Sequence, residues 1–152
     1  MESNNMNMQQ AADKADALLD ETLAAIKPPV EWTHRVTPPR DCSTDRIRAV
    51  MTIISPHRRE SFMGLVERYW LSKGFKLRAH APDKSAAYYA SADGFQASIK
   101  FGYAGQAFFE VTTPCVTPSS VAPPTSEPNG YDYSKQELPT PNVHSSFWSA
   151  SA

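Results

Sequence analysis

The chain has only two cysteines among its 152 residues, and their positions constrain the fold more than any other feature. Cys42 comes just before a predicted strand, and Cys115 comes just after another. If the elements between them alternate in direction, these two strands are antiparallel and both cysteines lie at one end of the sheet. Adjacent strands would then bring the sulfur atoms within the few ångströms that a disulfide requires. We therefore predict a Cys42–Cys115 disulfide, with two free thiols as the alternative.

A disulfide at this position has consequences for the compartment. Disulfides persist in oxidising environments, so the prediction places the chain outside the cell or on its surface, either secreted or lipid-anchored. The spacing of the two cysteines matches no CxxC redox motif, and no histidines stand at the spacing of zinc ligands. The predicted bridge is therefore structural.

The sequence between the cysteines predicts a two-layer α+β domain over residues 42–115. Alternating apolar residues predict a first strand at 46–54. Ser55-Pro56 starts a helix that ends before Gly74, and further strands are expected at 75–78, 86–91, 95–101 and 108–113. Asp93-Gly94 is typical of a hairpin turn. The expected order is β-α-β-β-β-β, which makes a five-stranded antiparallel sheet.

The two flanking segments have different compositions. Residues 1–41 contain an amphipathic pattern over 9–27, which predicts an additional N-terminal helix, followed by a proline-rich connector. Residues 116–152 are rich in proline and serine and show no apolar period, so we expect a mostly disordered tail. Its Phe147-Trp148 pair could instead dock on a partner or on the domain itself.

Charge is unevenly distributed along the chain. Lys+Arg minus Asp+Glu gives 4 − 7 = −3 for residues 1–41, 10 − 6 = +4 for 42–115 and 1 − 3 = −2 for 116–152. With the apolar residues of the strands inward, the other face of the sheet would carry Arg46, Arg48, Lys76, Arg78 and Lys100. Such a basic face could bind an anionic envelope polymer, a lipid headgroup or an acidic protein. Alternatively it is an ordinary solvated face, or the acidic N-terminal helix covers it.

Motifs for catalysis, metals and cofactors are missing from the sequence. The four histidines form no HExxH or HxH pattern, and there is no GxSxG, GxGxxG or P-loop sequence. The net charge of −1 also gives no general attraction to nucleic acid. We expect no metal, no cofactor, no catalytic residues and no nucleic-acid partner.

Several stretches resemble known sequences. These are AADKADALLDETL at residues 11–23, IKPPVEW at 26–32, VERYW at 66–70 with GF at 74–75, and FEVTTPC at 109–115. Together they resemble the mature part of small actinobacterial exported lipoproteins, a family with no assigned activity. The resemblance implies an envelope location and, in that family, a lipid anchor on an N-terminal cysteine behind a signal peptide. Residues 1–41 contain no cysteine that could carry this anchor. Because no apolar run in the sequence is long enough to span a membrane, attachment is expected only through an N-terminal lipid anchor.

These observations predict a non-enzymatic, exported or surface-anchored monomer that binds a partner or an anionic envelope component. The first alternative is an immunity or inhibitor protein that occludes a secreted enzyme or toxin. The second is a hydrolase or transferase whose site is assembled only in the fold, which a pocket with a histidine hydrogen-bonded to a carboxylate would favour.

Overall fold

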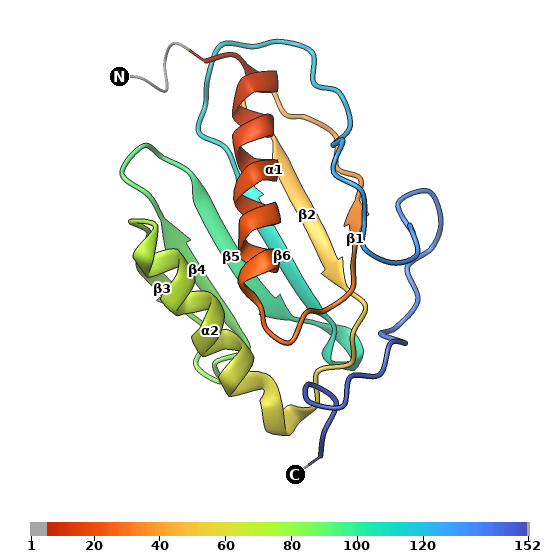
Figure 1. The fold of residues 1–152 in the computed structure, drawn as a ribbon. Helices are drawn as coiled ribbons and strands as arrows, with labels where there is room; N and C mark the ends of the chain where they lie inside the picture. Colours follow the sequence, from red (N-terminus) through yellow and green to blue (C-terminus); the bar gives the residue numbers. More distant parts are fainter. Residues whose placement is uncertain (1–5, 152) are drawn as a thin grey trace.

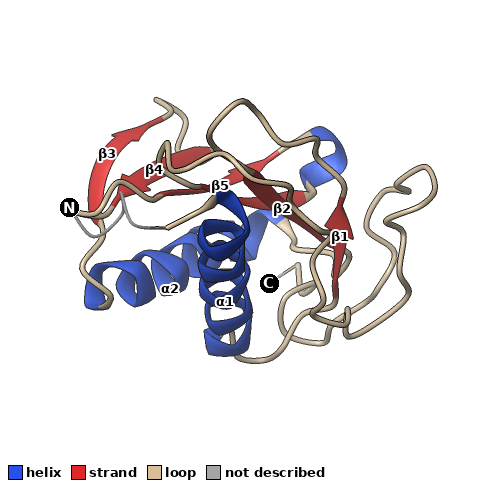
Figure 2. Ribbon diagram, turned by 90° about the horizontal axis from the view of Figure 1, so that it is seen from above, coloured by secondary structure: helices blue, strands red, loops and turns tan. Residues whose placement is uncertain are grey.

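The computed structural model describes residues 6–151 and shows an α+β fold. Two helices pack on one side of a six-stranded antiparallel sheet (Figures 1 and 2). The helices are α1 (Met8–Ala25) and α2 (Arg59–Ser72). The strands are β1 (Trp32–Arg35), β2 (Asp45–Val50), β3 (Lys76–His80), β4 (Ala86–Ala90), β5 (Gln96–Phe101) and β6 (Ala107–Thr112).

The sheet has one more strand than the sequence predicted. Its order is β1-β2-β6-β5-β4-β3, and every neighbouring pair is antiparallel. The five expected strands are all present, and β2 lies beside β6, as the cysteine argument requires. The extra strand, β1, lies in the expected connector, where Trp32 pairs with Val50 of β2. These four residues lie between prolines and are too short a segment to predict a strand from sequence alone. They form a strand because they pair with the edge of β2.

The helices were predicted correctly to within a few residues. Asn7 caps α1, and its side chain and that of Gln10 hydrogen-bond each other's backbone N–H in a capping box. A single-turn 3₁₀ helix at Pro56–Arg58 precedes α2, and Gly74 ends it with φ +92°. The buried Trp70 joins the two helices, because its Nε1 donates to Thr22 Oγ1 at 2.9 Å.

The C-terminal residues form no helix or strand after β6 within the described chain, but they pack against the fold. Trp148 is buried against Phe62, with ring centroids 5.1 Å apart, and its Nε1 donates to the Pro28 carbonyl at 2.6 Å. Figure 1 shows this blue segment following β1 before it reaches the base of α2. The expectation of a mostly disordered tail is therefore wrong for residues 116–151. The three segments inferred from composition are parts of one layered fold.

Candidate functional site

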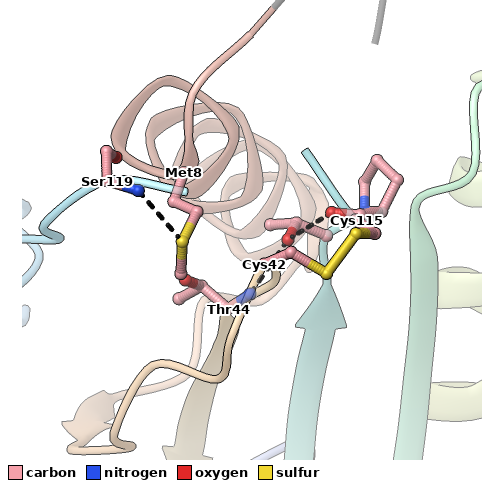
Figure 3. The surroundings of a disulfide bond; sticks show 7 residues. Met8, Cys42, Thr44, Cys115 and Ser119 are labelled. Carbon is pink, nitrogen blue, oxygen red and sulfur yellow. Dashed lines mark hydrogen bonds between the residues drawn. A yellow bond between two sulfur atoms is a disulfide. The ribbon is translucent and has the colours of Figure 1, made fainter. Parts of the chain in front are cut away.

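The disulfide is present where the sequence predicted it. Cys42 and Cys115 are bonded, with their Cα atoms 4.8 Å apart, at the end of the sheet where β2 begins and β6 ends (Figure 3). The same corner holds the start of α1, because the Ser119 amide donates to Met8 Sδ at 3.3 Å. The Val116 amide also donates to the Cys42 carbonyl. The bridge therefore fixes the sheet, the tail and the first helix together.

Two of the five residues predicted for a basic face lie on the other side of the sheet. Arg46 and Arg48 point toward α1 and are buried, and Arg48 has an exposed fraction of 0%. Arg46 Nε is 3.1 Å from Asp16 Oδ2, and Arg48 Nη1 is 2.6 Å from Asp20 Oδ1. Their assignment to an open ligand face was wrong. The acidic helix covers them, as the alternative interpretation had it.

Burial governs the electrostatics of this cluster. Desolvation raises the pKa of Asp16, although Arg46 and Arg48 oppose the shift. Desolvation also lowers the pKa of Arg48 and that of the neighbouring His34, whose Nε2 lies 2.7 Å from the Ser126 carbonyl. The Arg48 guanidinium lies 4.3 Å from the centroid of the Trp32 ring. These charges hold α1, β2 and the tail together, so their role is structural.

The other three predicted residues are exposed but lie apart. Lys76 and Arg78 belong to β3, and Lys100 belongs to β5 on the face away from the helices. The register places Lys76 level with Gln96, so Lys100 is two strands away and four residues further along. Strand spacing and rise put the Cα atoms of Lys76 and Lys100 about 17 Å apart. No single basic face joins all five residues.

The sheet face away from the helices has a mixed character. It carries a hollow of about 340 Å³, lined by Arg35, Ile47, Ser98, Lys100, Phe108 and Glu110. The Arg35 guanidinium donates to the Tyr133 carbonyl of the tail at 2.9 Å. Burial raises the pKa of Glu110, with Asp45 adding to the shift and Lys100 opposing it. Among the charged groups that line this hollow, Arg35 is therefore bound to the tail.

A larger hollow lies between α2 and the strands β3 and β4. This groove has a volume of about 730 Å³. Its apolar lining comes from Met63, Leu77, Ala87, Tyr89 and Phe101, and charged side chains also line it: Arg59, Glu60, Glu67, Asp83 and Lys84. We call it the α2–β3 groove. Sequence reasoning missed this groove. The groove forms because α2 does not cover the outer strand β3, and no local sequence pattern shows how far a helix extends over a sheet.

Some polar groups of the α2–β3 groove bond within the fold, whereas the buried Arg59 Nε has no hydrogen-bond partner in the described chain. The Tyr89 hydroxyl donates to Glu67 Oε2 at 3.0 Å, and burial raises the pKa of Tyr89. His80 Nδ1 contacts the Ala81 carbonyl at 3.0 Å. Within residues 6–151 the hydrogen bonds of His34 and His80 go to main-chain carbonyl groups, those of Ser126 and Ala81.

The two edges of the sheet differ in how they are covered. At the β1 edge the Trp32 amide donates to Asn129 Oδ1 at 3.0 Å, and the Tyr133 amide donates to Thr33 Oγ1 at 2.8 Å. The tail therefore closes this edge. At the other edge all five residues of β3 are exposed, and no described strand pairs with its outer side. Figure 2 shows β3 at the far side of the sheet from β1 and its surrounding loops.

Two further features of the described residues bear on function. None of the helices in this part of the chain combines the length and the apolar character needed to span a bilayer. No cluster of three or more His, Cys, Asp or Glu side chains within the same residues is arranged to hold a metal ion. Comparison with known protein families, with curated proteins and with solved structures finds no match to this chain.

Proposed function

We propose that this chain is an exported, non-enzymatic domain that binds a protein partner at the α2–β3 groove. The observation that carries the proposal is the open strand β3 beside a groove of about 730 Å³ that is lined by both apolar and charged side chains. Unpaired edge strands attract other polypeptides, and folds commonly cover them. Here the tail covers the β1 edge and leaves the β3 edge free.

Export is supported by the disulfide, since such bridges persist in oxidising compartments. The resemblance to small exported lipoproteins of actinobacteria points to the same envelope location, with a lipid anchor as the means of membrane attachment. A binding role is supported by the exposed apolar side chain of Leu77 in the groove.

A protein partner fits the site better than an anionic envelope polymer or headgroup. Arg46 and Arg48 are covered by α1, and Lys100 lies two strands from Lys76, so a repeating anionic ligand would meet few of the five cations at once. An immunity or inhibitor protein, which blocks a secreted enzyme or toxin by one-to-one binding, is a specific form of this proposal.

Site-specific photo-crosslinking tests the proposal. A photoreactive benzophenone amino acid would replace Leu77 in the groove or, as a matched control, Tyr88 on the opposite face. The two side chains are similarly exposed, at 44% and 47%. Irradiation of the producing cells should give a discrete protein adduct from position 77 that is absent from position 88. Equal labelling at both positions, or no adduct at 77, would contradict the assigned site.

A further inference from the structure

We infer that the partner contributes an extended acidic segment, which pairs with β3 as a seventh strand of the sheet. This inference rests on the proposed function and specifies how the α2–β3 groove is used. It follows from three features of β3: its free edge, the alternation of its side chains and its charge.

The free edge provides main-chain hydrogen-bonding groups. β3 is paired with β4 on one side only, through contacts from Lys76↔Ala90 to His80↔Ala87. In an antiparallel sheet, alternate residues direct their N–H and C=O groups to the outer side. A polypeptide lying about 4.8 Å outside β3 would satisfy these groups. Strand addition of this kind takes its affinity from the main chain and its specificity from alternate side chains.

The alternation of side chains along β3 determines which residues the added strand would contact on each face of the sheet. Leu77 pairs with the buried Tyr89 and lines the groove. Lys76 pairs with Ala90 and belongs to the opposite face. A neighbouring strand would therefore place every second side chain toward the groove beside Leu77, and the others beside Lys76. The register shift between Leu77 and Ala79 leaves Arg78 as the extra residue of a bulge.

The charge of β3 selects the partner. Its sequence, KLRAH, contains two fixed cations and a histidine but no acid. A second copy pairing antiparallel about Arg78 would set the two Arg78 cations against each other. Like charges directly opposite each other destabilise a sheet. The edge therefore disfavours self-association, in keeping with the expected monomer, and favours a strand that carries Asp or Glu.

A random peptide library supplies the probe. Phage displaying 12-residue random peptides would be selected on the full-length, disulfide-bonded protein, and enriched peptides would be synthesised with a fluorescent label. We expect acidic residues alternating with apolar ones. Binding is then measured by fluorescence anisotropy to the wild type, to Lys76→Glu/Arg78→Glu and to the control Lys100→Glu/Lys135→Glu. Both double variants alter two exposed cations and change the net charge equally.

The expected result is at least a tenfold loss of affinity in Lys76→Glu/Arg78→Glu and little change in the control, with unchanged melting temperatures for both variants. Methylating alternate backbone nitrogens of the peptide along one edge should abolish binding, whereas methylating the other edge should not. Equal losses in both variants, enrichment without acidic residues, or tolerance of methylation on both edges would overturn the inference. If one of these results were accompanied by a photoadduct at Leu77, the groove would still be a protein-binding site. Only the inference that the partner adds a strand to β3 would be wrong.

Discussion

Replacing Arg48 by Met should destabilise the fold substantially, because a buried charge cluster would lose its central cation. Arg48 is fully buried and contacts both Asp16 and Asp20. Removing one partner of a buried ion pair typically costs about 3 to 5 kcal/mol. The lower value applies here for two reasons: Asp20 is half-exposed and can be rehydrated, and Asp16 keeps its contact with Arg46 at 3.1 Å.

We therefore expect Arg48→Met to lower the free energy of unfolding by about 3 kcal/mol, or the melting temperature by about 6 to 12 °C. Urea unfolding followed by circular dichroism measures the change. Adding Asp20→Asn removes the carboxylate that Arg48→Met leaves without its partner at 2.6 Å, so the double variant should recover about 1 to 2 kcal/mol relative to additive costs. The control is Arg68→Met on the exposed face of α2, expected to change stability by less than about 0.5 kcal/mol. If Arg48→Met costs no more than Arg68→Met, the cluster does not hold α1 to the sheet.

Three further outcomes are expected. Replacing Cys42 and Cys115 by Ser opens a loop with a sequence separation of 73; this should cost about 4 kcal/mol in thermal or urea unfolding, and an unchanged transition would refute the stabilising role. Trp148→Ala should cost about 3 to 5 kcal/mol, whereas the exposed Tyr131→Ala in the same tail should cost much less; equal small effects would mean that the tail is loose. Burial lowers the folded-state pKa of His34 below 6.5, so unfolding takes up a proton and stability should fall as the pH drops from 7 to 5. Urea titrations across this range should show a flatter profile for His34→Gln, and identical slopes would contradict the assignment.

The parts of the fold that could be predicted depend on local signals. Gly74 and Gly94 both have positive φ, at +92° and +93°, at the helix end and the hairpin turn where the sequence placed them. The disulfide followed from the alternating direction of the strands, a topological rule that needs only the element order. Each of these signals lies within a few residues of the feature it predicts.

The errors arose where a distant partner decided the outcome. In β2 the alternation suggested that Ile47 faces the helices, but Arg46 and Arg48 do so instead, because Asp16 and Asp20 on α1 neutralise them. The partners are about 30 residues away in sequence, and no strand pattern contains that information. The tail failed for a similar reason. The tail is held by single buried residues such as Trp148. Periodicity of apolar residues cannot reveal a contact made by one residue.

The position of Trp148 has a consequence for how the chain folds. The core includes both Met8, at the start of α1, and Trp148, which packs on Phe62. A chain that emerges N-terminus first, from a ribosome or through a secretion pore, cannot complete this core until residue 148 has emerged. Until then Phe62 lacks the Trp148 ring that packs against it, and the earlier residues are less stable than in the complete fold. The core of this fold is therefore completed only when nearly the whole chain is available.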